Sequence, residues 1–156
     1  MDCKEKLAKY FRENSVKYTA VTHPTAYTAQ EVAAVEHVPG RQFAKVAMVN
    51  ADGKMVMLVL PASHRIDFPK LKAALEVKDA RLAKEAEFEN LFPDCDTGAM
   101  PPFGNFYNVP LYADKSLTAD PEIVFNAGTH RDTLRVQYAD YARLAQPQVI
   151  EFAAHL

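Results

Sequence analysis

Hydrophobic residues recur along this chain with two different periods, and each period predicts a different kind of element. Leu7, Tyr10 and Phe11 follow one another at three- and four-residue intervals, the spacing of one face of a helix. Asp2 and Glu5 precede them at the spacing of a capping box, a pair that binds the free backbone N–H groups of a first helical turn. The first element is therefore expected to be an amphipathic helix.

The clearest local signal is a hairpin. Residues 44–50 and 55–60 are strongly hydrophobic and flank Asp52-Gly53, a pair favoured in two-residue type I′ turns. Both segments are apolar at successive positions, so both of their faces are expected to be buried. They are therefore predicted to be central strands of a sheet rather than edge strands.

The remaining elements follow from the same two periods and from the residues that interrupt them. Further strands are predicted at 17–22, 109–113, 122–126, 133–137 and 149–152, with helices starting after Thr28 and Asp67 and spanning 84–92 and 138–145. The intervening residues 94–108 are rich in Gly and Pro and are expected to be irregular. This mixture predicts an α/β (mixed α+β) fold, and the length suits a single domain, taken as residues 1–156.

Composition and charge narrow the classes of partner. The chain has 18 Lys and Arg against 20 Asp and Glu, a formal net charge of −2, and 49% hydrophobic residues, as in ordinary globular domains. A basic protein would attract polyanions over its whole surface, so nucleic-acid contact is expected to be local here and duplex DNA is not expected. Residues 1–6 lack the apolar segment of a secretory signal, and the apolar run 55–61 is too short to span a membrane.

The two cysteines indicate a reducing environment. Cys3 and Cys95 are far apart in the sequence and match no metal-binding or redox spacing, which is typical of a cytoplasmic protein. Asp94 and Asp96 flank Cys95, and two neighbouring carboxylates are expected to disfavour its thiolate. Neither cysteine is predicted to be catalytic.

Lys45 is the most informative single residue for function. If Asp52-Gly53 is a two-residue loop, Lys45 lies opposite Leu60. It then shares one face of the hairpin with Ala47, Val49, Val56, Leu58 and Leu60. An ammonium on an apolar face is costly unless it reaches water or an anion. Two interpretations remain open: a strand-end lysine that extends into solvent, or a cation at the mouth of a ligand pocket.

A glycine- and proline-rich loop is the second candidate for a functional site. Its central residues are Gly98, Ala99, Met100, Pro101 and Pro102, followed by Phe103-Gly104. Glycine allows positive φ angles and close approach to a ligand, while proline lowers the entropy lost on ordering the loop. Free backbone N–H groups in such a loop can bind an oxyanion, although the prolines supply none. The alternative is an ordinary connecting loop at the surface.

A short turn between two predicted strands is the third candidate. It contains Gly128, Thr129 and His130, and the histidine could donate a hydrogen bond or act as a base near neutral pH. The alternative is a solvated turn residue. His23, which precedes Pro24, has a similar alternative, a bond to the local backbone.

Sequence motifs for cofactors are absent. The chain has neither a phosphate-binding P-loop nor a dinucleotide fingerprint, and it has no paired His or Cys spacing typical of a metal site. No metal and no cofactor are therefore expected.

The three candidates occur in one order that resembles a known family. Together with an N-terminal segment they are similar to the signature of the YbaK-like aminoacyl-tRNA deacylases. The order in the chain is His23-Pro24 to Ala33, Lys45, Gly98–Pro102 and Gly128–His130. This family is related to the editing insertion domain of bacterial prolyl-tRNA synthetase. The resemblance covers residues 23–152 and rests on the ordered set rather than on any single motif.

The resemblance implies both a fold and an activity. The fold would be a compact domain with a central mixed, partly barrel-like β-sheet flanked by helices. The activity would be hydrolysis, in trans, of the ester that joins a wrong amino acid to the 3′ acceptor end of a mischarged tRNA. Lys45 would be the catalytic residue, and Gly98–Pro102 with Gly128–His130 would bind the aminoacyl-adenosine end. A synthetase is a further candidate partner, and no cofactor is implied.

The implied chemistry makes modest demands on the protein. An aminoacyl ester is already activated, so the enzyme must mainly orient water and stabilise a developing oxyanion. In the family the 2′-hydroxyl of the substrate is thought to help activate that water. Pocket volume would select the amino acid, and Tyr27, Met48 and His130 are candidate pocket residues. Two other functions remain open: a non-catalytic tRNA- or synthetase-binding module, and a hydrolase of small acyl esters unrelated to tRNA.

Overall fold

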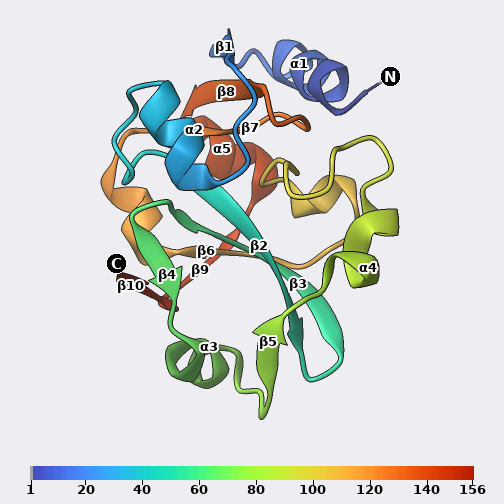
Figure 1. Ribbon diagram of the computed structural model, residues 1–156, viewed down its shortest axis with the longest axis vertical. Coiled ribbons are helices and arrows are strands. Elements are labelled where there is room, and N and C mark those ends of the chain that lie inside the picture. Colours follow the sequence, from blue (N-terminus) through green and yellow to red (C-terminus); the bar gives the residue numbers. More distant parts are fainter. Residues whose placement is uncertain (1) are drawn as a thin grey trace.

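A five-stranded mixed sheet forms the centre of the computed structural model, which describes residues 2–156 (Figure 1). The strand order is β5-β2-β3-β6-β9, with bounds Ala80–Leu82, Ala44–Ala51, Lys54–Pro61, Leu111–Asp114 and Gln148–Ile150. The β5-β2 and β2-β3 pairs are antiparallel, whereas β3-β6 and β6-β9 are parallel. The two hairpin strands are central, as their two-sided hydrophobicity predicts.

Two smaller antiparallel sheets flank the central one. The order is β1-β8-β7 in the first and β10-β4 in the second. Their bounds are Tyr18–Thr22, Asp132–Gln137 and Glu122–Asn126 for the first, and Ala153–His155 and His64–Ile66 for the second. A parallel bridge between Phe43 and Val124 connects the first to the start of β2. The mixed α/β fold is confirmed, and the central sheet is not closed into a barrel.

The five helices of the described residues 2–156 begin where the sequence places their caps or close to it. They are α1 (Cys3–Glu13), α2 (Ala29–Val35), α3 (Phe68–Leu75), α4 (Glu85–Phe88) and α5 (Tyr138–Ala145), with 3₁₀ turns at Glu89–Leu91, Gly104–Phe106 and Lys115–Ala119. Asp2, Thr28 and Asp67 each accept a hydrogen bond from the backbone N–H three residues further on. These bonds satisfy donors that a first helical turn otherwise leaves free. None of the helices in residues 2–156 is long and apolar enough to cross a membrane.

The predicted elements differ from the observed ones mainly at the chain's irregular segments. The helix expected over 84–92 is one helical turn followed by a 3₁₀ turn. The strand expected over 149–152 is interrupted, because the Asp114 carboxylate accepts the backbone N–H groups of Phe152 and Ala153 at 2.7 and 2.9 Å. That contact turns the chain out of the central sheet after β9 and into the small sheet as β10.

The register of the hairpin decides which side chains face which core. Ala51 lies opposite Lys54 and Lys45 lies opposite Leu60, as the two-residue turn predicts. Asp52 and Gly53 have φ angles of 49° and 85°, the left-handed values that a type I′ turn requires. Successive residues of a strand point to opposite faces, so the hairpin separates two cores. One contains Ala44, Met48, Met57, Val59, Met100 and Phe103, and the other contains Val49, Val56, Leu58, Leu60, Leu71 and Phe152.

Candidate functional site

Lys45 lines an open cleft on the second of these two faces. The cleft has a volume of about 370 Å³ and is lined by Lys45, Ala47, Leu60, Arg65, Ile66, Phe68 and Leu82. The lysine is half-buried, and its ammonium makes no hydrogen bond or ion pair with any residue in the described part of the chain. Burial lowers its pKa, because a less hydrated ammonium is less stable. The cleft therefore presents a cation that no neighbouring carboxylate neutralises.

Arg65 is a second cation in the same cleft, and the sequence analysis misses it. It lies on β4, a three-residue strand with no hydrophobic alternation to predict it, and it pairs with Ala154 of β10. Its side chain is exposed, and within residues 2–156 it forms no ion pair. Only the folding of β4 against the end of β3 brings Arg65 into the same cleft as Lys45.

The loop at Gly98–Pro102 is more deeply buried than a surface connector would be. Gly98 is exposed, but Ala99, Met100, Pro101 and Pro102 are all buried, and the expectation of a surface loop is wrong for these four residues. The buried Tyr141 of α5 donates its hydroxyl hydrogen to the Pro102 carbonyl at 2.8 Å. Because a helix side chain anchors it, the second half of the loop is part of the core.

Hydrogen bonds inside the loop limit the groups that could stabilise an oxyanion. The Ala99 N–H already donates to the Asp96 carbonyl at 3.0 Å. The Gly98 N–H faces the Met100 sulfur, a weak acceptor, at 3.2 Å. The Met100 N–H has no partner among residues 2–156. Of the backbone donors in the loop, those of Gly98 and Met100 are thus the ones free enough to bind a ligand.

The turn at Gly128–His130 packs directly against this loop. The Gly128 N–H donates to the Ala99 carbonyl at 3.0 Å, and the Asp96 N–H donates to the Gly128 carbonyl at 2.7 Å. His130 donates through Nε2 to the Thr97 carbonyl at 3.2 Å, and its ring lies 3.7 Å from the place a Gly98 side chain would take. The fold therefore brings two of the three candidate segments together. Gly98–Pro102 and Gly128–His130 are called the loop unit from here on.

Lys45 is not part of that unit. Met100 belongs to the core on the Ala44 and Met48 face of β2, whereas Lys45 points to the opposite face. Within the described chain no hydrogen bond or ion pair joins the lysine to Gly98–Pro102. A substrate that contacts both would have to reach across an edge of the hairpin.

The candidate pocket residues fall in different environments. Tyr27 is 68% exposed and its ring centroid lies 4.8 Å from that of His130, so the two rings form one surface beside Gly98. Met48 is only 3% exposed and lies in the core. A substrate side chain could therefore reach Tyr27 and His130 but not Met48.

Comparisons with known proteins agree with the resemblance seen in the sequence. A family model described as an aminoacyl-tRNA editing domain matches residues 23–144. The chain belongs to this family of aminoacyl-tRNA editing domains. It is accordingly a hydrolase that acts on aminoacyl-tRNA.

Two curated relatives and one solved structure illustrate the family. The chain is 29% identical to the multifunctional Ser/Thr-tRNA deacylase ProXp-y of Escherichia coli over 95% of this chain and 91% of the relative. It is also 29% identical to a proline–tRNA ligase of Geobacillus thermodenitrificans, covering 82% of this chain but 24% of the ligase. A crystal structure of a candidate trans-editing enzyme for prolyl tRNA synthetase superposes with a TM-score of 0.82 at 21% identity, over 97% of each chain. That structural likeness shows the fold alone.

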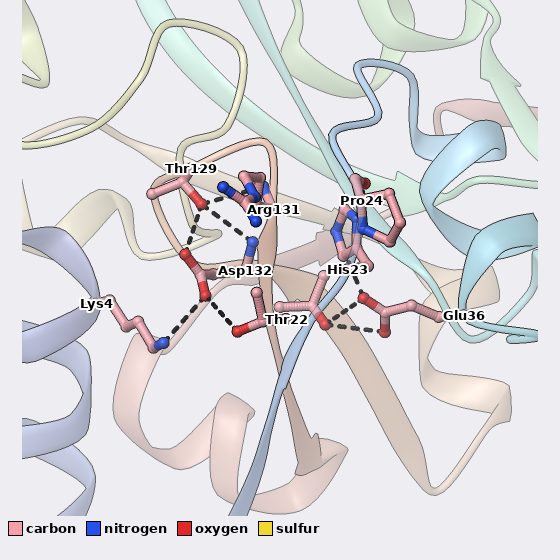
Figure 2. A network of polar contacts seen from close by, with 9 residues as sticks. Lys4, Thr22, His23, Pro24, Glu36, Thr129, Arg131 and Asp132 are labelled. Carbon is pink, nitrogen blue, oxygen red and sulfur yellow. Dashed lines mark hydrogen bonds and ion pairs between the residues drawn. The ribbon is translucent and has the colours of Figure 1, made fainter.

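A polar network holds the Gly128–His130 turn of this editing domain in place (Figure 2). The Thr129 hydroxyl donates to Asp132 Oδ2 at 2.7 Å and accepts the backbone N–H groups of Arg131 and Asp132. Thr22 and Lys4 bind the other oxygen of the Asp132 carboxylate, each at 3.0 Å. Burial raises the pKa of Asp132, but these hydrogen bonds outweigh it and the net pKa is lowered. The Thr129 hydroxyl thus already has three partners within the fold.

His23 has the local role that the sequence analysis leaves open. Its Nδ1–H donates to the Pro24 carbonyl at 2.6 Å, and its Nε2 lies 3.5 Å from Glu36 Oε2 (Figure 2). Both Glu36 carboxylate oxygens lie within hydrogen-bond distance of the Thr133 hydroxyl, at 2.9 and 2.7 Å, and share its one hydrogen. This buried group joins α2 to β8 and so fixes the chain that leads to Tyr27.

The first turn of α1 holds both parts of the loop unit, although α1 lies outside the matched residues 23–144. Lys4 pairs with Asp132, and Lys6 pairs with Asp94 at 2.9 Å. Cys3 packs on Gly128 so closely that a Cβ atom there would lie 2.5 Å from the cysteine Cβ. No group of side chains suited to hold a metal ion is found among residues 2–156.

Proposed function

We propose that residues 1–156 act as one unit that hydrolyses the ester of mischarged tRNA in trans. The observation that carries this proposal is the unpaired Lys45 in an open cleft of a chain that belongs to the editing family. The relative ProXp-y is matched over nearly its whole length and is named a deacylase, which supports an action separate from a synthetase. We place this activity in the cytoplasm, where tRNA is charged.

Lys45 and Arg65 are proposed to hold the acceptor end of the tRNA by its charge. The chain carries a formal net charge of −2, so a polyanion gains little from the protein as a whole. Two cations that lack partners in the described part of the chain can instead contact one or two phosphates without breaking an ion pair seen there. Lys45, which is half-buried, would be the closer of the two to the aminoacyl end, which would have to reach across an edge of the hairpin to contact the Gly98–Pro102 loop as well.

The loop unit is proposed to position the aminoacyl-adenosine. Gly98 has no side chain between the backbone and the surface formed by Tyr27 and His130. A terminal adenine or ribose can approach the backbone there, and the N–H groups of Gly98 and Met100 can donate to the ester carbonyl as it becomes an oxyanion. Such a site orients water and stabilises charge, which is sufficient for an activated ester. The remaining residues of the unit, Ala99, Pro101, Pro102, Gly128 and Thr129, would keep this geometry.

The amino acid to be removed is proposed from the relative that the chain resembles over most of its length. ProXp-y is named a Ser/Thr-tRNA deacylase, so seryl- and threonyl-tRNA are the first substrates to test. The surface made of Tyr27 and His130 offers polar groups to a side-chain hydroxyl. Recognition of a hydroxyl discriminates more strongly than recognition of one methylene.

A panel of aminoacylated tRNAs tests the proposal. Purified full chain would be incubated with tRNAs charged with serine, threonine, alanine, cysteine or proline, and loss of the amino acid would be followed under single-turnover conditions. We expect faster deacylation of seryl- and threonyl-tRNA than of correctly charged prolyl-tRNA, and loss of that activity in Lys45→Ala. Binding of tRNA without hydrolysis of any member would contradict the proposal and favour a tRNA- or synthetase-binding module. Hydrolysis of small aminoacyl esters but of no tRNA would favour the small-ester hydrolase.

A further inference from the structure

The two cysteines, which the sequence separates widely, converge on one tyrosine. Cys95 Sγ lies 3.2 Å from the Tyr107 hydroxyl oxygen, and Cys3 Sγ lies 3.9 Å from the same atom. The Cys3 backbone N–H also donates to the carbonyl of Asp94, the residue before Cys95, at 3.3 Å. The first residue of α1 and the segment before Gly98 are therefore neighbours in backbone as well as in side chain.

The surroundings make the two thiols unequal. Cys3 is 2% exposed, whereas Cys95 is half-buried and reachable from solvent. A hydrogen bond between the two thiols is the largest influence on both: it raises the pKa of Cys3 far above its usual range and lowers the pKa of Cys95. Asp94 does raise the pKa of Cys95, as expected of a flanking acid, but the hydrogen bonds from Cys3 and Tyr107 outweigh it and the net pKa is lowered.

The acid beside Cys95 is already engaged by other groups. Asp94 Oδ1 accepts the Tyr107 hydroxyl at 3.0 Å, and Asp94 Oδ2 pairs with Lys6 at 2.9 Å. The Lys6 ammonium also lies 4.8 Å from the centre of the Tyr107 ring. This cation offsets the carboxylate, so the cluster as a whole tolerates a negative charge on Cys95.

We infer that Cys3 and Cys95 form an oxidation site that a peroxide converts into an intramolecular disulfide. The Cys95 thiolate attacks one oxygen of hydrogen peroxide, the O–O bond breaks, and Cys95 becomes a sulfenic acid while hydroxide takes up a proton as water. The Cys3 thiol then loses its proton and its sulfur attacks the Cys95 sulfur, so that the S–O bond breaks and a second water leaves. Two thiols and one peroxide thus give one disulfide and two waters.

The disulfide would join the first turn of α1 to the segment that leads into the loop unit. Cys95 lies shortly before Gly98, and Cys3 packs on Gly128, so the bond would tie α1 covalently to the segment that the Lys6–Asp94 pair now holds by charge. This site does not depend on the proposed deacylation, since neither thiol lines the Lys45 cleft.

Thiol counting by mass spectrometry tests the inference. Reduced full chain would be treated with a small excess of hydrogen peroxide, denatured, alkylated with N-ethylmaleimide and weighed intact. We expect loss of both alkylatable thiols, a chain lighter by two hydrogen atoms, monomeric migration on a non-reducing gel, and full reversal by dithiothreitol. Two alkylated thiols after treatment, a Cys95 oxidised to sulfinic acid beside a free Cys3, or a disulfide between two chains would each overturn the inference.

Single variants separate the two roles. Cys3→Ser should stop at the sulfenic acid and then over-oxidise, because no thiol remains to resolve it. Cys95→Ser should leave the buried Cys3 alkylatable after the same treatment. Tyr107→Phe removes a hydrogen bond to Cys95 and should slow its oxidation without preventing disulfide formation.

The Cys3→Ser, Cys95→Ser double variant should keep its deacylation rate, which checks that the fold is intact.

Discussion

At the scale of single residues, the proposed chemistry depends on a lysine whose ammonium has no polar partner among residues 2–156. Burial lowers the pKa of Lys45, which means that the folded protein holds this ammonium at a cost. A folded-state pKa below the unfolded value makes the group destabilising while it is protonated, and that penalty fades as the pH rises toward the unfolded pKa. Lys45 is therefore retained at the expense of stability, as expected of a group that meets a ligand.

Replacement of Lys45 by alanine should abolish most deacylation and leave the fold intact. We expect a loss of about 100-fold or more in the single-turnover rate, comparable to removal of one oxyanion-stabilising donor. The melting temperature should stay the same or rise, because a half-buried charge is removed. Lys54→Ala, at the exposed far end of the same hairpin, is the matched control and should edit normally. Wild-type activity in Lys45→Ala would refute the assignment.

Gly128 should not tolerate a side chain. Its φ of +94° disfavours any side chain, and a Cβ atom would meet Cys3 Cβ at 2.5 Å. We expect Gly128→Ala to destabilise the protein by about 3 kcal/mol or more, from backbone strain and the clash together.

A second substitution separates the two contributions at Gly128. Cys3→Gly removes the atoms in the way, so the double variant should recover part of the loss while the backbone strain remains. Urea unfolding of the four proteins gives the coupling free energy. Additive single effects would show that the contact with Cys3 is unimportant.

Sequence reasoning places some of these residues and misses others for a definite reason. The face occupied by Lys45 follows from one turn, since Asp52-Gly53 fixes the register of both strands. Arg65 and the Cys3–Cys95 pair depend on segments that meet only in the folded chain. No local pattern could have found them.

At the scale of elements, the loop that contains Gly98 is held from behind by α5. The Tyr141 hydroxyl is the donor to the Pro102 carbonyl, and both groups are buried. Hydrophobic periodicity predicts α5 with its observed bounds, but it predicts nothing about a loop whose order comes from a tyrosine far along the chain. For the same reason, the sequence does not predict the burial of residues 99–102.

A substitution at the exposed start of the loop should lower turnover more than stability. Substitutions that loosen the loop from behind should lower stability more than turnover. Gly98→Val forces a side chain onto a φ of +88° beside His130, so we expect a strong loss of turnover with about 1–2 kcal/mol of destabilisation. Tyr141→Phe leaves the Pro102 carbonyl without its donor and should destabilise by about 1–3 kcal/mol, with a smaller loss of turnover. Pro102→Ala, in a buried position, should resemble Tyr141→Phe. If, in all three variants, turnover falls only in proportion to the loss of stability, the loop is purely structural. Single-turnover deacylation and urea unfolding measure both quantities.

At the scale of the whole molecule, a buried carboxylate ties the central sheet to the end of the chain. Asp114 is 4% exposed and accepts the N–H groups of Phe152, Ala153 and Ser116. Burial raises its pKa, but these hydrogen bonds outweigh that effect and the net pKa is lowered. A lowered folded pKa supplies stability above the unfolded pKa of about 3.9, and that stability is lost as the pH falls through the folded pKa.

Asp114→Asn should therefore destabilise the protein most at neutral pH. We expect a loss of about 1.5–3 kcal/mol near pH 7, from the weaker hydrogen bonds of an uncharged acceptor. The difference from wild type should shrink as the pH falls below about 4, where the carboxylate begins to protonate in the unfolded chain, and should be smallest below the lowered folded pKa. Urea unfolding as a function of pH measures it. A difference that stays constant down to pH 2 would show that the charge of Asp114 is irrelevant.

The interaction with tRNA should be weak and only slightly dependent on salt. The net charge of −2 and the two cations of the cleft leave few phosphate contacts. About one to three contacts would give a slope of log affinity against log salt of about −1 to −3. Arg65→Ala should make the slope shallower by about one. Arg131→Ala, which removes a cation outside the cleft, serves as the comparison. A steep slope would indicate a larger basic surface than the cleft provides.

The position of α1 has a consequence for the order in which this protein is made. An isolated helix of 11 residues is marginal in water, so α1 needs tertiary contacts in order to persist. Its partners Asp94, Gly128 and Asp132 leave the ribosome long after α1 does. This helix can therefore dock only when most of residues 2–156 have emerged, and its docking is what locks the two loops together. A nascent chain that stalls before Asp132 would expose its hairpin but hold no assembled editing site.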